Sequence, residues 1–168
     1  IEHPSVFNVF KELEGKYEVC YLDVNEEGII DLDQLKQEMN QDTVLVSIMW
    51  VNNIIGSVQP IKEIIEVVKK YKKAHLHVDC VQGMCKVLND FNFNDIDMFT
   101  FSTHKIYGPK GIGALFVRDG IELHKRLYGS TAQYSIKPGT FDLSLIAATA
   151  KCFIKFFNKT QVHREDVK

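Results

Sequence analysis

Apolar residues recur along the chain in two patterns, one at helical spacing and one as short continuous runs. At helical spacing they form amphipathic segments, and one of these opens with Pro60, a residue common at the first turn of a helix. Another starts at Asp31 with Gln34 three residues later, which resembles a capping box. Helices are therefore predicted at 6–13, 31–39, 60–71 and 143–157.

The continuous apolar runs predict strands, because five to seven apolar or β-branched residues between turn signals are typical of buried strands. The clearest run covers 43–49 and leads into Asn52 and Asn53. Strands are predicted at 17–22, 43–49, 75–79, 97–102 and 113–117. Strands that alternate with amphipathic helices indicate an α/β protein, a three-layer sandwich with a largely parallel sheet.

Polar side chains follow three of these predicted strands. In parallel sheets ligands bind beyond the carboxyl ends of the strands, where such groups meet. The groups expected to converge there are amides, one carboxylate, one hydroxyl, one imidazole and one amine: Asn52, Asn53, Asp79, Gln82, Ser102, His104 and Lys105.

The segment 102–113 separates the last two predicted strands and is expected to be a loop, because it holds three glycines and Pro109. It is no dinucleotide fingerprint, since Gly111 and Gly113 run into a strand rather than a helix. It is no P-loop either, since Lys110 is followed by glycine and not by Ser or Thr. A ligand held by Ser102, His104 and Lys105 is the functional alternative to an ordinary solvated turn.

Composition narrows the choice of partners. The 168 residues carry a formal charge of −2, so nothing points to nucleic acid or an anionic membrane, and small molecules or proteins are expected instead. Four scattered cysteines without Cys-x-x-Cys spacing are expected to be reduced and structural. This predicts a protein that is not secreted and resides in a mitochondrial matrix or a bacterial-type cytoplasm.

Two chemistries fit the convergent groups. His75, His77 and Asp79 share one face of a strand and could form a metallohydrolase site, although the neighbouring Lys105 disfavours a cation. The other reading, with no metal, is a pyridoxal 5'-phosphate site. That cofactor needs a lysine, a carboxylate for its ring nitrogen, and hydroxyl or imidazole donors for its phosphate. Lys105, Asp79, Ser102 and His104 supply these groups.

Four stretches carry a resemblance to a known family: Asp79-Cys80-Val81-Gln82, the segment 102–115, Val51-Asn52-Asn53 and Glu2-His3. Together they resemble the cysteine desulfurases of the class V aminotransferase family. The resemblance implies part of the large domain of a fold-type-I pyridoxal-phosphate enzyme. Such an enzyme releases L-alanine from L-cysteine and passes the sulfur, as a persulfide, to acceptor or scaffold proteins of iron–sulfur cluster assembly or thiolation. It is expected to be a homodimer.

The resemblance also implies roles for single residues. Lys105 would bond covalently to the cofactor, and His3 would stack on its ring and assist proton transfer. Asp79 would pair with the ring nitrogen, and Asn53 and Gln82 would approach the phenolic oxygen or the substrate. Phosphate contacts are implied for Ser102 and His104, and for Thr140 across the dimer.

The same resemblance predicts a partial cofactor-binding domain at 1–158, without the family's N-terminal phosphate loop, and the start of a connection to a small domain at 159–168. The nucleophilic cysteine and the substrate-binding arginine are expected after residue 168, so Cys80 is expected to be a packing residue. Ile54 stands where the family usually has Glu. A selenocysteine lyase, another class V lyase or transaminase, and a non-catalytic scaffold homologue are the alternatives within the family.

Overall fold

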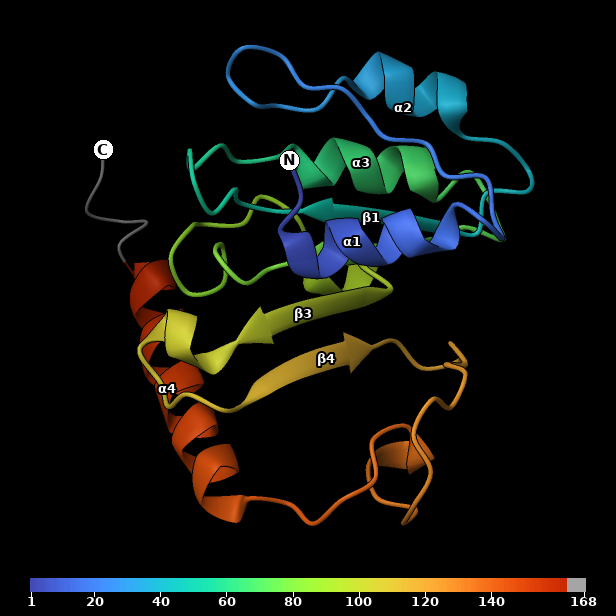
Figure 1. Cartoon of the computed structure of the whole chain (residues 1–168). Helices are drawn as coiled ribbons and strands as arrows, with labels where there is room; N and C mark the ends of the chain where they lie inside the picture. Colours follow the sequence, from blue (N-terminus) through green and yellow to red (C-terminus); the bar gives the residue numbers. More distant parts are fainter. Residues whose placement is uncertain (163–168) are drawn as a thin grey trace.

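The computed structural model describes residues 1–162, and a four-stranded sheet forms its centre (Figure 1). The strands lie in chain order: β1 (Leu45–Met49), β2 (His75–Asp79), β3 (Met98–Ser102) and β4 (Gly113–Val117). β1, β2 and β3 are parallel, whereas β4 pairs with β3 in the antiparallel direction. The carboxyl ends of the three parallel strands therefore meet at one edge of the sheet.

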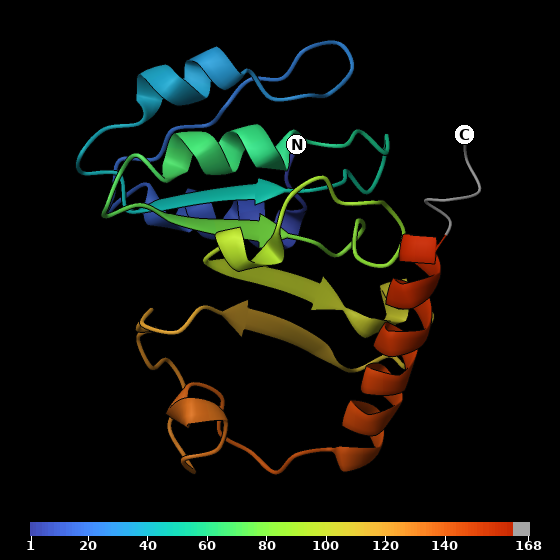
Figure 2. The ribbon, with the colours of Figure 1, turned by 180° about the vertical axis from the view of Figure 1, so that it is seen from behind.

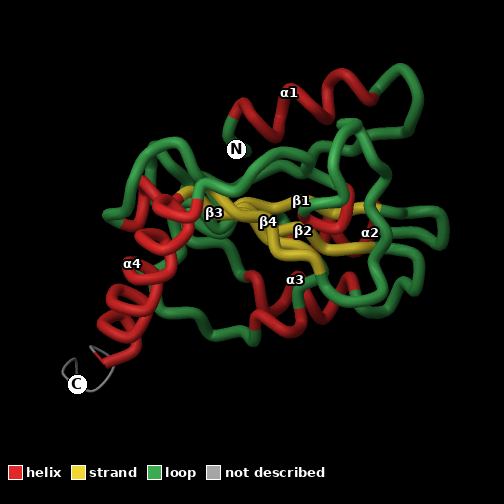
Figure 3. Tube along the Cα trace, turned by 90° about the horizontal axis from the view of Figure 1, so that it is seen from below, coloured by secondary structure: helices red, strands yellow, loops and turns green. Residues whose placement is uncertain are grey.

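Helices cover both faces of this sheet. α1 (Pro4–Leu13) lies on one face and α3 (Ile61–Val68) on the other, and α2 (Leu32–Glu38) packs against α3 near the β1 edge of the sheet (Figures 2 and 3). α4 (Leu143–Val162) packs beside the end of β3 on the side of α3. Short 3-10 helices complete the described part: η1 (Phe93–Asp95), η2 (Thr103–Ile106) and η3 (Gln133–Ser135). The arrangement is the predicted three-layer sandwich.

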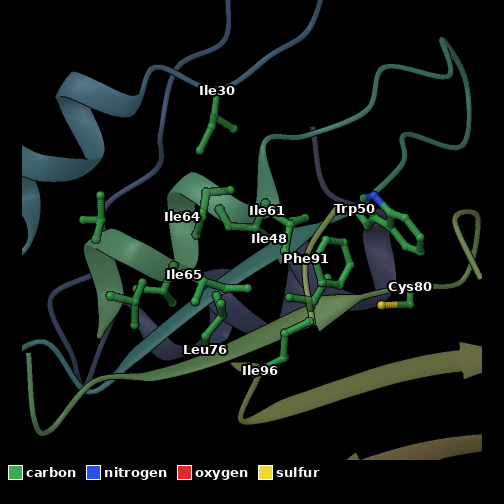
Figure 4. Close-up of a cluster of buried hydrophobic side chains, with 14 of the residues drawn as sticks. Ile30, Ile48, Trp50, Ile61, Ile64, Ile65, Leu76, Cys80, Phe91 and Ile96 are labelled. Carbon is green, nitrogen blue, oxygen red and sulfur yellow. The ribbon is translucent and has the colours of Figure 1, made fainter. Parts of the chain in front are cut away.

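The main hydrophobic core fills the space between the sheet and α3 (Figure 4). Ile61 and Ile64 on α3 are fully buried, as is Val78 on β2. Trp50, which follows β1, packs edge-on against Phe91 with ring centroids 5.1 Å apart. The amphipathic pattern after Pro60 thus faces the core as expected, because each buried aliphatic side chain removes apolar surface from water.

Most element ends agree with the sequence. His3 caps α1, and Asp31 caps α2 by accepting hydrogen bonds from the backbone N–H groups of Asp33 and Gln34. Gln34 does not close the expected capping box, because its side-chain oxygen accepts from the N–H of Asp23 instead. None of the helices within residues 1–162 has the length and apolarity needed to cross a bilayer.

Two further sequence expectations were wrong. Residues 17–22 form no strand; only an isolated bridge between Val24 and Ile30 follows. The segment 102–113 is also not purely a loop, since η2 occupies its first four residues after Ser102, before the glycines begin. The predicted domain boundary after residue 158 falls within α4 and stays a prediction, and residues 163–168 lie outside the described part.

Candidate active site

A pocket of about 350 Å³ opens at the edge where β1, β2 and β3 end. Its walls come from the start of α1 and from the segments that follow the three parallel strands. The structure thus brings together seven of the eight residues to which the family resemblance assigns roles. The complete lining is His3, Ser5, Met49, Val51, Asn53, Asp79, Val81, Gln82, Ser102, His104 and Lys105.

Lys105 reaches the pocket from η2, directly after β3. Thr103 and Ile106 of this short helix are fully buried, so the turn is anchored from below while Lys105 remains exposed. Tyr107 ends the helix in the left-handed conformation (φ 64°), and the N–H of Gly108 donates to the carbonyl of Thr103 at 3.0 Å. The buried side chains and this hydrogen bond therefore hold the backbone that carries the Lys105 amine in place.

Asp79 ends β2 and is 7% exposed. Its Oδ1 accepts a hydrogen bond from the N–H of Val81 at 2.9 Å. A carboxylate this deeply buried is costly unless a positive group or several donors oppose it. Its position on the pocket wall therefore favours a cationic group of a ligand.

His3 is the N-cap residue of α1. Its Nδ1 accepts from the N–H of Ser5 at 3.2 Å and lies 2.8 Å from the Ser5 hydroxyl. Since Nδ1 is the acceptor, the neutral ring carries its proton on Nε2, and this nitrogen is left for a ligand in the pocket.

The two asparagines after β1 have different roles. Asn52 is buried, and its Oδ1 accepts from the N–H groups of Ile54 and Ile55 at 2.8 and 3.0 Å. Its Nδ2 donates to the carbonyl of Ile1 at 2.9 Å. Asn52 thus shapes the turn, whereas Asn53 lines the pocket.

Thr140, like Asn52, was predicted to belong to the site but does not line the pocket. It is exposed in the segment between η3 and α4. Since the sequence expectation places its contact across a dimer, its role stays a prediction.

Glu2 was not given a role by the sequence, although it precedes His3. Its Oε1 accepts from the N–H of Met49, while Oε2 is buried without a hydrogen-bond partner. Burial first, and the charge of Asp79 to a lesser degree, raises the pKa of Glu2 from 4.5 to about 7. Sequence alone held no signal for this burial, because the contact spans 47 residues.

The two histidines predicted for a metallohydrolase site contact other side chains instead. His77 lies between two hydroxyls, with Nδ1 2.8 Å from Ser47 Oγ and Nε2 3.3 Å from Thr100 Oγ1. His75 faces Asp97 at 4.0 Å. Within residues 1–162 no three His, Cys, Asp or Glu side chains form a metal-binding group. The geometry therefore gives this reading no support.

The donor set of the pocket does fit pyridoxal phosphate. It combines an exposed lysine, a buried carboxylate, and a hydroxyl and an imidazole beside the lysine: Lys105, Asp79, Ser102 and His104. The first two suit an aldehyde and a protonated ring nitrogen, and the others suit a phosphate.

Known proteins resemble this chain in sequence and in structure. The cysteine desulfurase IscS of Neisseria gonorrhoeae is 43% identical over 155 residues, which cover 90% of this chain and 38% of that protein. A solved NifS-like protein has a TM-score of 0.91 at 30% identity over 98% of this chain and 46% of its own. The structure of SspA in complex with cysteine gives 0.85 at 35% identity over 99% and 50%.

These proteins confirm the predicted fold class and the resemblance found in the sequence. The chain spans about two fifths of the length of the curated relatives it matches. The family described as aminotransferase class-V matches residues 1–144, which is most of the sequence. The chain therefore belongs to the class V aminotransferase family.

Proposed function

We propose that the complete protein is a cysteine desulfurase that uses pyridoxal phosphate, the cofactor of its family. It would convert L-cysteine into L-alanine and deliver the sulfur to an enzyme thiol. The observation that carries the proposal is that Lys105, Asp79 and His3 line one pocket. Similarity to an IscS protein and to SspA, which was solved with cysteine, supports this substrate.

Seven residues of the pocket would have defined tasks in this reaction. When bound, the cofactor supplies a sink for the electron pair that remains at the substrate Cα after proton loss. Asp79 would hold the ring nitrogen in its protonated form, because that charge pair stabilises the buried carboxylate. Lys105 would bind the cofactor covalently and move protons at Nζ once released.

The remaining groups orient the reactants. Ser102 and His104 would hold the phosphate, and His3 would lie against the ring with its Nε2 able to exchange a proton. Asn53 and Gln82 would contact the phenolic oxygen or the substrate. These contacts fix the geometry in which proton transfer occurs.

Sulfur transfer needs a thiol. The C–S bond of cysteine breaks, its electron pair stays with Cβ, which takes up a proton, and an S–S bond forms to the enzyme thiolate. Cys80 adjoins Asp79 but is fully buried, and burial raises the pKa of its thiol. Because none of the four cysteines lines the pocket, we infer that the accepting thiol is none of them.

We further propose a homodimer in which Thr140 reaches the phosphate site of the partner subunit, and a sulfur-acceptor or scaffold protein as the final recipient. The exposed aromatic rings of Tyr128 and Tyr134, which precede Thr140, suit a protein contact. Four free cysteines suit a mitochondrial matrix or a bacterial-type cytoplasm.

The test is cofactor binding and turnover by the complete protein. It should show the visible absorption band of lysine-bound pyridoxal phosphate and release alanine from L-cysteine. Lys105→Ala should lose both. Lys110→Ala is the matched control, because Lys110 is exposed in the same segment but does not line the pocket; it should retain both.

A complete protein that binds no pyridoxal phosphate would refute the proposal. Alanine formed from selenocysteine but not from cysteine would instead identify a selenocysteine lyase. Cofactor binding without turnover of either amino acid would point to a scaffold homologue or another class V lyase or transaminase. The isolated 168-residue chain should release no alanine.

A further inference from the structure

A second lysine lies beside the pocket, at a position with no role in the account above. Lys86 Nζ donates a hydrogen bond to Oε1 of Gln82 at 2.9 Å. The backbone forms a tight turn here, with the N–H of Met84 bonded to the carbonyl of Cys80 and that of Val87 to Gly83. Because positions four apart lie on the same side of such a turn, the two side chains meet.

This contact determines which end of the Gln82 amide points at Lys86. An ammonium group has only donors, so its amide partner must be the oxygen. The NH₂ group of Gln82 is then the end left for the pocket, which Gln82 lines. Without Lys86 the amide could rotate and present its oxygen instead, which would repel an anionic ligand atom.

The charges around Lys86 agree with this geometry. Partial burial first, and the charge of Lys105 second, lower the pKa of Lys86. The charge of Lys105 therefore reaches Lys86 at the edge of the pocket. A pocket wall with two nearby cations attracts an anionic ligand.

We propose that Lys86 is a positioning residue, which holds the Gln82 amide so that its NH₂ group donates to an ionised oxygen of bound pyridoxal phosphate. The inference rests on the proposed function, since it takes the cofactor as the ligand. Lys86 acts through Gln82 and does not itself contact the cofactor.

The experiment is a double-mutant cycle on cofactor affinity, which does not depend on turnover. The dissociation constant of pyridoxal phosphate is measured with the complete apo-protein and its Lys86→Met, Gln82→Ala and doubly substituted variants. Lys86→Met should bind about 10-fold more weakly, as expected for one hydrogen bond that involves a charged group. The double variant should bind no more weakly than Gln82→Ala alone, because Lys86 then has nothing to position.

Two further variants sharpen the test. Lys86→Arg keeps donors and charge and should bind within about threefold of the wild type. Lys72→Met removes an exposed lysine between α3 and β2, at the opposite edge of the sheet, and should leave the affinity unchanged.

An undiminished effect of Lys86→Met in the Gln82→Ala background would overturn the inference, because the lysine would then act by charge alone. Equal affinity of Lys86→Met and the wild type would overturn it as well, while leaving the proposed function intact. Failure of the wild type to bind pyridoxal phosphate would overturn both.

Discussion

Gly83 lies directly against the indole of Trp50. A Cβ at position 83 would stand 2.3 Å from Cε3 and 2.5 Å from Cδ2 of that ring, closer than real Cβ atoms approach. Trp50 is 2% exposed, and interior side chains are close-packed, so the ring has little room to withdraw. The contact holds the turn that carries Gln82 against the end of β1.

Gly83→Ala is therefore expected to lower the free energy of unfolding by about 1–3 kcal/mol, the usual cost of overpacking. Urea denaturation of the apo-protein measures this. Gly15→Ala is the control, because no heavy atom lies within 4 Å of a Cβ at that position; it should be neutral or slightly stabilising. Similar urea midpoints for the two variants would show that the Trp50 ring can shift to make room, which would contradict the prediction.

The Asp97 carboxylate should contribute more to the free energy of unfolding than an ordinary surface charge does. Its Oδ2 accepts from the N–H of Leu76 at 2.7 Å, and its Oδ1 lies 3.3 Å from Arg118. Asp97→Ala leaves a backbone donor and a half-buried guanidinium without this partner, so we expect a loss of about 2–4 kcal/mol in unfolding free energy.

The control for Asp97 is Asp42→Ala. Asp42 pairs with Lys73 at 3.1 Å, but both side chains are largely exposed. Such a pair contributes under about 1 kcal/mol. Equal losses of unfolding free energy for Asp97→Ala and Asp42→Ala in urea denaturation would contradict the prediction, because the partial burial of Asp97 would then add nothing to stability.

Glu2 should make stability depend on pH. Its pKa rises from 4.5 to about 7 in the folded protein, so the native state holds this proton more tightly than the unfolded state. Stability is therefore expected to fall as the pH rises from about 4.5 through about 7, and then to level off.

Glu2→Gln should remove that slope, since an amide does not ionise. The variant should resemble the wild type near pH 5 and exceed its unfolding free energy at pH 8, by on the order of 2 kcal/mol after allowance for partial solvent contact. Glu12→Gln, at an exposed site on α1, should keep the wild-type slope. Parallel pH profiles for Glu2→Gln and the wild type would contradict the burial effect.

Cys80 should be chemically inert despite its place next to Asp79. Burial first, and the charge of Asp79 second, raises the pKa of its thiol, and the side chain is fully buried. Brief alkylation of the native protein, followed by mass spectrometry, should label the exposed Cys20 and spare Cys80. Labelling of both at one rate, or loss of desulfuration in Cys80→Ala, would contradict this.

The sequence predicted the sheet and the convergence of the pocket residues, because both follow from local patterns. The apolar run before Asn52 is typical of a buried strand, and parallel strands place Asp79 and Lys105 at one edge. The helix after Asp31 had its own start signal in the capping side chain.

The features that the sequence could not reveal depend on contacts with residues outside the local segment. Residues 17–22 have strand propensity but no neighbouring strand, and Tyr21 instead donates to Glu14 and packs on Phe7. The burial of Glu2 under Met49 depends on how α1 lies on the sheet. No periodicity encodes such a contact.

The buried hydroxyl of Thr103 helps to hold the backbone of the segment that carries Lys105 in place. It lies 3.2 Å from the hydroxyl of Thr149 on α4, and the backbone of Thr103 is bonded to Ile112 and Gly108 on either side. Backbone amides here should exchange with solvent as slowly as those of the central strands. The Lys105 amine would then move only by rotation about its side-chain bonds, while the backbone of the segment stays in place.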